Sequence, residues 1–69
     1  MLMVEIDPDK KKPLYEQIYE EIKRQIQVGT LPEKTKLPSA RALAKRLEIS
    51  RNTVDLAYGQ LTAEGYIES

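Results

Sequence analysis

Apolar residues recur with helical spacing in three stretches of the 69-residue chain. The first stretch predicts a helix over about residues 13–28, with Pro13 in its first turn and Gly29 as its stop. Its apolar stripe consists of residues four apart, Leu14, Ile18, Ile22 and Ile26. Residues 1–12 precede this helix as an N-terminal entry segment.

The second and third stretches are shorter and share one pattern, with apolar residues at i, i+3, i+4 and i+7. The second predicted helix ends near Leu47, and the third ends near Glu64. Ser39 and Ser50 stand directly before these helices, and we expect both to be N-caps. Because only the turn 48–50 separates the two helices, the pattern predicts a helix-turn-helix covered by the first helix.

Charge is unevenly distributed along the chain, although 11 basic and 11 acidic side chains cancel overall. Residues 34–51 carry six basic side chains and one acidic, a net charge of +5, whereas residues 52–69 carry three acidic side chains and no basic one. Surface charges act over about 8–10 Å at physiological salt, so the local excess matters more than the total. Taken alone, such a run of bases is more often a solvated basic helix face than a nucleic-acid site, and the residues within it decide between the two.

The start of the third predicted helix carries the side chains that read base edges in DNA: Ser50, Arg51, Asn52 and Thr53. A helix N-terminus also attracts phosphate. On a helical wheel Asn52 and Leu56 point outward, while Arg51 and Asp55 flank one side. Asp55 either accepts a hydrogen bond from a cytosine amino group or orients Arg51.

The preceding segment offers contacts to the DNA backbone. Arg41 lies one turn inside the second helix, opposite the apolar stripe, and Lys36 is a weaker candidate for a phosphate contact. Two other interpretations remain open: a plain three-helix bundle with no nucleic-acid role, and a module for protein contact, which the exposed Leu56 and the zero net charge favour mildly.

Enzymatic function finds little support in the composition. The chain has no Cys and no His, no glycine-rich phosphate loop and no nucleophile beside a base. It also has no apolar run of the roughly 18 residues that a membrane helix needs. We expect a non-enzymatic, cytoplasmic protein without a bound cofactor or metal.

Three motifs at fixed distances resemble the N-terminal winged helix-turn-helix domain of the GntR family of bacterial transcription regulators. They are PLYEQIY, then LPSARALA, then SRNTVDLAYGQLTAEGYI, and the MocR-type branch is the most similar, with the YtrA-type branch second. The resemblance implies a mainly α winged helix-turn-helix over residues 13–69. It also implies a small sheet of Lys36-Leu37 and residues 66–68, whose wing is incomplete in this chain. The candidate DNA-binding residues are Lys36, Ser39, Arg41, Ser50, Arg51, Asn52 and Thr53.

The resemblance further implies a homodimer on double-stranded operator DNA and a C-terminal effector domain. In the MocR-type branch that domain binds pyridoxal phosphate, and none of it is in this chain. We therefore expect the 69 residues alone to bind DNA weakly. Two residues stand where the family often has Gly, namely Lys34 in the loop and Glu48 in the turn. A left-handed backbone at Glu48 would cost about 1 kcal/mol.

Overall fold

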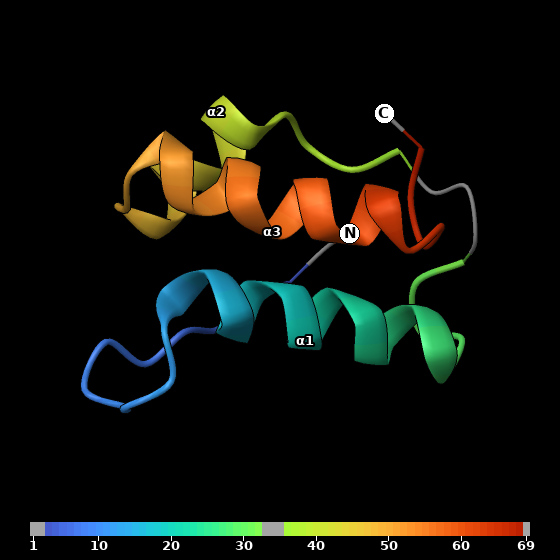
Figure 1. The fold of residues 1–69 in the computed structure, drawn as a ribbon, viewed down its shortest axis with the longest axis horizontal. Coiled ribbons are helices and arrows are strands. Elements are labelled where there is room, and N and C mark those ends of the chain that lie inside the picture. Colours follow the sequence, from blue (N-terminus) through green and yellow to red (C-terminus); the bar gives the residue numbers. More distant parts are fainter. Residues whose placement is uncertain (1–2, 33–35, 69) are drawn as a thin grey trace.

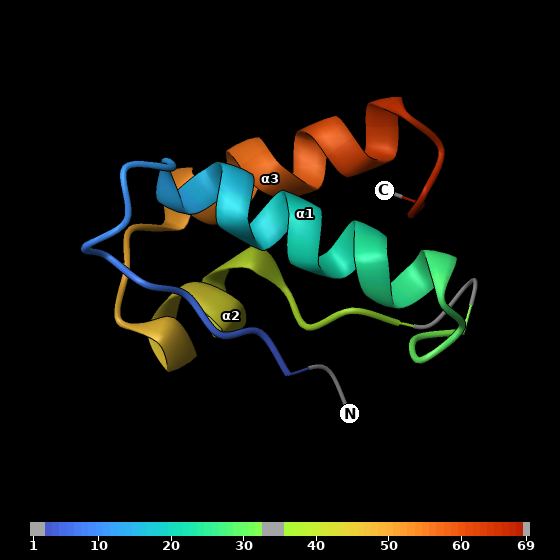
Figure 2. The ribbon, with the colours of Figure 1, turned by 90° about the horizontal axis from the view of Figure 1, so that it is seen from below.

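Three helices make up the fold in a computed structural model that describes residues 3–32 and 36–68. They are α1 (Leu14–Gln27), α2 (Ala40–Leu47) and α3 (Arg51–Ala63). Helix α3 packs against both α1 and α2 (Figure 1), and the view from below shows α1 in front of this arrangement (Figure 2). All three helices predicted from the apolar spacing are confirmed.

The ends of α1 and α3 follow from local backbone chemistry. Helix α1 begins at Leu14, one residue later than predicted, so Pro13 is its N-cap and not part of its first turn. The Pro13 carbonyl accepts hydrogen bonds from the backbone N–H groups of Glu16 and Gln17, both at 3.1 Å. Gly29 and Gly65 have φ angles of 84° and 83°, a left-handed conformation that ends a helix and that glycine adopts without strain. The predicted stops are therefore confirmed.

The core is shared by all three helices. Five side chains are almost completely buried, namely Ile18, Ile22, Leu43, Val54 and Leu61. Tyr19, Leu31, Ala44 and Ala57 complete the buried cluster. Each apolar stripe of the sequence thus supplies residues to one core, and this common core holds α2 and α3 in a fixed relation.

The turn between α2 and α3 has the geometry that the sequence suggested. Glu48 has φ 59° and ψ 45°, the left-handed conformation considered for this position. The backbone N–H of Ile49 returns to the carbonyl of Ala44 at 3.0 Å, and the Ile49 side chain packs against the core. The turn is therefore well defined, at a strain cost of about 1 kcal/mol for a non-glycine residue.

The N-terminal segment is anchored to α1 by two glutamine side chains. Gln25, only 7% exposed, donates to the carbonyl of Met3 at 2.7 Å. Gln17 accepts from the backbone N–H of Asp7 at 2.8 Å and donates to the Asp7 carbonyl at 3.0 Å. Val4 and Ile6 pack against the core, so this segment contributes to the folded unit.

The sheet expected at the wing is not formed, because the described residues contain no strand. Two positions within or beside the expected strands at 36–37 and 66–68, Tyr66 and Pro38, offer no free backbone N–H to a sheet. The N–H of Tyr66 closes the end of α3 on the carbonyl of Leu61 at 2.9 Å, and Pro38 has no N–H to offer. The carbonyl of Pro38 accepts from the Tyr58 hydroxyl at 2.7 Å. Lys34, the other expected departure from the family pattern, lies outside the described residues.

Candidate nucleic-acid interface

Ser50 caps the first turn of α3. Its Oγ accepts from the backbone N–H of Thr53 at 3.2 Å and lies 2.8 Å from the Thr53 Oγ1. The predicted cap is confirmed, and Thr53 is drawn toward it and only partly exposed. Two of the four candidate base-reading side chains therefore also stabilise the helix start.

Arg51 and Asn52 are exposed at the same helix end. The Arg51 Nε lies 3.6 Å from the Asp55 Oδ2, and both side chains remain largely exposed, at 66% and 51%. Such a pair at the surface contributes little to stability. Its geometry supports the second role considered for Asp55, which is to orient the Arg51 guanidinium.

The start of α2 repeats the capped arrangement. The Ser39 Oγ accepts from the backbone N–H of Ala42 at 3.1 Å, so this predicted cap is confirmed. Arg41 is exposed and makes no ion pair or hydrogen bond within the part of the chain that the structure describes. An unpaired guanidinium in the first turn of a helix is available to an anionic ligand.

Tyr58 ties the start of α2 to α3. Its hydroxyl donates to the carbonyl of Pro38, directly before the Ser39 cap, and burial raises the pKa of this hydroxyl to about 12. Arg46 acts in the opposite direction on the pKa and is the smaller influence. The apolar spacing of α3 indicates only a packing role for Tyr58, since nothing in that spacing points to a partner 20 positions earlier.

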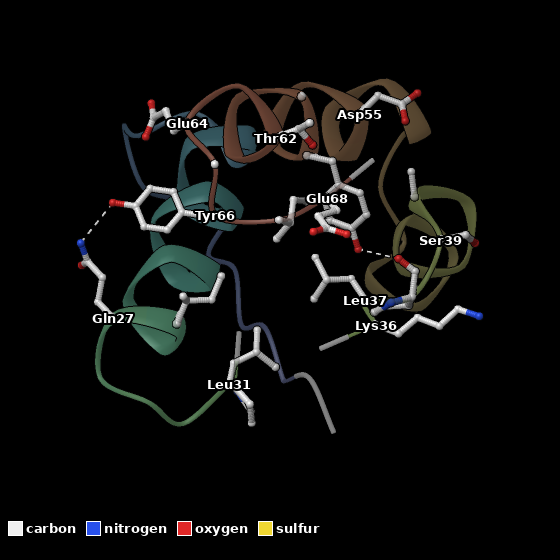
Figure 3. Close-up of a pocket in the computed structure, with 18 residues that line it drawn as sticks. Gln27, Leu31, Lys36, Leu37, Ser39, Asp55, Thr62, Glu64, Tyr66 and Glu68 are labelled. Carbon is white, nitrogen blue, oxygen red and sulfur yellow. Dashed lines mark hydrogen bonds between the residues drawn. The ribbon is translucent and has the colours of Figure 1, made fainter. Parts of the chain in front are cut away.

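A hollow separates the start of α2 from the C-terminal half of α3, and Figure 3 shows its lining. Lys36 and Ser39 lie on one side, Asp55 and Thr62 belong to α3, and Tyr66 lies on the opposite side (Figure 3). The Lys36 amino group points away from the hollow (Figure 3). Asp55 lines the hollow and also lies beside Arg51. The candidates at the start of α2, Lys36 and Ser39, and those at the start of α3 therefore border one region.

Two further observations bear on other kinds of site. Within residues 3–32 and 36–68, no group of three or more His, Cys, Asp or Glu side chains is placed to hold a metal ion. None of the helices described is long and apolar enough to cross a membrane.

The family comparison decides among the readings of this fold. A family model described as "Bacterial regulatory proteins, gntR family" matches residues 14–69. The chain belongs to the GntR family. Its helix-turn-helix is thus the DNA-binding domain of a transcription regulator family that is not enzymatic, and the comparisons give no support to the protein-contact module.

Individual relatives agree with this assignment. The chain is 43% identical over 67 residues to the probable rhizopine catabolism regulatory protein MocR of Rhizobium meliloti, covering 97% of the chain and 14% of that protein. It is 42% identical over 67 residues to the transcriptional repressor YtrA of Bacillus subtilis, covering 97% of the chain and 52% of the repressor.

A solved structure of YtrA from Sulfolobus acidocaldarius, a GntR-family transcription factor, superposes with a TM-score of 0.84. It is 42% identical and is matched over 90% of this chain and 66% of its own length. The architecture of the family's winged helix-turn-helix domain is therefore confirmed in its three helices, whereas the described residues contain no strand at the wing. The chain spans between 14% and 52% of the length of the two curated relatives described above.

Proposed function

We propose that this GntR-family domain binds double-stranded operator DNA sequence-specifically, with α3 in the major groove. The observation that carries the proposal is the capped start of α3, where Arg51 and Asn52 are exposed on a fixed helix end. Arg reads guanine and Asn reads adenine by paired hydrogen bonds. A cytoplasmic location, with the DNA, is part of this proposal.

The proposal gives Arg51 and Arg41 different tasks. Asp55 holds the Arg51 guanidinium beside the first turn of α3, and a fixed donor discriminates between bases. Arg41 has no such orienting partner in the described chain and lies at the start of α2, where it contacts a phosphate. Lys36 and Ser39 supply further contacts to the DNA around Arg41. Ser50 and Thr53 lie at the start of α3, beside the bases that Arg51 and Asn52 read.

For the longer proteins that share this domain, we propose binding as two copies on adjacent half-sites and regulation by a small-molecule effector. The resemblance to the family supports this extension. Two copies would bind half-sites about 10 base pairs apart, one helical turn. A footprint over a single half-site at saturation would contradict the extension and leave the monomer contacts unaffected.

The experiment compares three alanine variants on one selected duplex and on a scrambled duplex. Arg51→Ala should cost about 1–3 kcal/mol on the selected duplex and relax base preference at one position. Arg41→Ala should weaken both duplexes alike and lower the salt slope by about one. Arg24→Ala is the matched control, because this substitution removes the same charge at a position on α1, where Arg24 is paired with Glu21 at 2.5 Å.

The affinity losses on the selected and scrambled duplexes distinguish base reading by Arg51 from phosphate contact by Arg41. Equal losses from Arg51→Ala on the selected and scrambled duplexes would show that Arg51 contacts phosphate only. A loss from Arg24→Ala as large as that from Arg41→Ala would show that binding responds to total charge, and the proposed contact region would then be wrong.

A further inference from the structure

An exposed leucine lies on the outward face of the helix that we place in the major groove. Leu56 is 60% exposed, one of three large apolar side chains among the described residues that are this open to solvent. Exposure of single apolar residues is ordinary on a protein surface. The position of Leu56, four residues after Asn52 on the same helix face, is what distinguishes it.

The surface of α3 one turn beyond Leu56 has no protruding side chain. Gly59, in the next turn, has no side chain, and a Cβ atom added there would meet nothing within 4 Å. Packing within the chain therefore does not require glycine at this position, although glycine disfavours a helix interior. Close approach of an external surface to the backbone is a reason for such a glycine.

We propose that Leu56 contacts the C5-methyl group of a thymine and is a specificity-determining residue for operator binding. This inference rests on the proposed function of α3. The thymine methyl is the one apolar group that a base pair presents in the major groove, and aliphatic side chains contact it. Four residues of helix rise by about 6 Å, so the thymine lies within about two base pairs of the position that Asn52 reads.

The chemistry of the region favours DNA over a protein as the surface that covers Leu56. Arg51 and Asn52 precede Leu56 by five and four positions, and unpaired Arg41 lies at the start of the neighbouring α2. Because these neighbours are cationic or form hydrogen bonds, the partner that covers Leu56 must be anionic and offer hydrogen-bonding groups. The methyl of thymine supplies the apolar contact within that partner.

The test removes the methyl group from the DNA and the leucine from the protein. The 69-residue chain is first used to select duplexes from a library with a random core of about 20 base pairs, two helical turns. Each thymine of the enriched duplex is then replaced in turn by deoxyuridine, which lacks only the C5-methyl group. At one thymine, the wild-type chain should lose about fourfold in affinity, the equivalent of one buried methyl group.

The protein variants complete the cycle. Leu56→Ala should bind the thymine and deoxyuridine duplexes with equal affinity, and its melting temperature should match that of the wild type because the side chain is exposed. Val28→Ala is the matched control. Val28 is 62% exposed on the C-cap of α1, which is not the helix placed in the groove, and this variant should keep the fourfold response.

Three results would overturn the inference. The wild-type chain could bind every deoxyuridine duplex as tightly as the parent, or Leu56→Ala could keep the response to the methyl group; either would show that Leu56 does not read thymine while operator binding stands. Failure of the library to yield any enriched duplex at low salt, where weak DNA binding is retained, would overturn the proposed function and the inference with it.

Discussion

Two regions of the molecule use their polar side chains in opposite ways. Around α1, charged and amide groups are engaged within the chain: Lys12 with Glu20 at 2.5 Å, Arg24 with Glu21 at 2.5 Å, and Gln25 with the Met3 carbonyl. On α2, among described residues, Arg41 in the first turn and Lys45 and Arg46 in the last turn make no ion pair or hydrogen bond. At the start of α3, Arg51 has only the exposed Asp55 as a partner, at 3.6 Å. The first region pairs its polar groups within the fold, and the second leaves most of its charges available for a ligand.

The polar cluster at the end of α3 extends the first region, the paired polar groups around α1, which we call the engaged region. The Tyr19 hydroxyl donates to Glu64, and this hydrogen bond lowers the pKa of the Glu64 carboxyl, with Gln60 as a second donor. The Lys23 ammonium lies 5.4 Å from the Tyr19 ring centroid and 5.5 Å from that of Tyr66. Helix α3 thus belongs to the engaged region at its C-terminus and to the available region at its N-terminus.

The core beneath both regions should give the largest effect. Leu61 is completely buried in α3, so Leu61→Ala should cost about 2–5 kcal/mol of unfolding free energy. That is a large part of the stability of a chain of this size, at about 0.05–0.15 kcal/mol per residue. DNA binding should be lost together with folding, as measured by urea denaturation and duplex titration.

Leu56→Ala is the matched control for this change, because it makes the same substitution five positions earlier at an exposed site. It should change the unfolding free energy by no more than about 0.5 kcal/mol. Similar losses of stability from the two variants would mean that α3 is rotated about its axis relative to the described packing.

Gln25 tests whether the engaged region serves stability alone. Gln25→Met keeps the length of the side chain but removes its hydrogen bonds to the Met3 carbonyl and to the Glu21 carboxylate, at 2.7 and 2.8 Å. Leaving a partly buried carbonyl without its donor should lower the unfolding free energy by about 1–2 kcal/mol. Duplex affinity measured well below the melting temperature should stay unchanged, and a parallel loss of affinity would contradict the separation of the two regions.

The two serine caps give the next effect, and they differ in a way that sharpens the comparison. Ser39 and Ser50 each accept one backbone N–H, but Ser50 also lies within hydrogen-bonding distance of the Thr53 hydroxyl. Ser50→Ala and Ser39→Ala should both reduce stability within about 0.5–2 kcal/mol, with the larger loss at Ser50. Equal thermal shifts, or none, would show that the Thr53 hydroxyl adds nothing to the cap.

Sequence reasoning predicted the features that depend on local pattern. Helix positions, both serine caps and the turn at residues 48–50 follow from spacing and from residues with strong positional preferences. The hydrogen bonds of Tyr58 to Pro38 and of Tyr19 to Glu64 join residues 20 and 45 positions apart. No periodicity encodes such partners, because many polar side chains satisfy the same local rules.

The missed strand assignment has a similar cause. Residues 66–68 have strand-forming composition, but the closing hydrogen bonds of α3 take the N–H groups of Gly65 and Tyr66. Composition describes what a segment favours in isolation, whereas the preceding helix determines which of its backbone groups remain free. The candidate site has the same limit. The sequence allows Asp55 either to accept from a cytosine amino group or to orient Arg51, and only the 3.6 Å distance between Arg51 Nε and Asp55 Oδ2 favours the second role.

The turn between the helices gives the smallest expected change and the only gain. Glu48 adopts the left-handed conformation with φ 59°, which costs a non-glycine residue about 1 kcal/mol and which glycine adopts without strain. Glycine loses more conformational entropy on folding, which offsets part of this. Glu48→Gly should therefore raise the unfolding free energy by about 0.5–1 kcal/mol. Glu48→Ala is the control, because it removes the same charge but keeps the Cβ atom and its strain.

The same pair of variants separates strain from charge in DNA binding. Glu48 is the one acidic residue between positions 34 and 51, and it directly follows α2 with its basic side chains. Both variants remove this charge, so both should tighten nonspecific binding at low salt by the same factor, while only Glu48→Gly gains stability. If the two variants are equally stable, the left-handed turn carries no strain. If neither tightens binding, the turn lies outside the surface that DNA approaches.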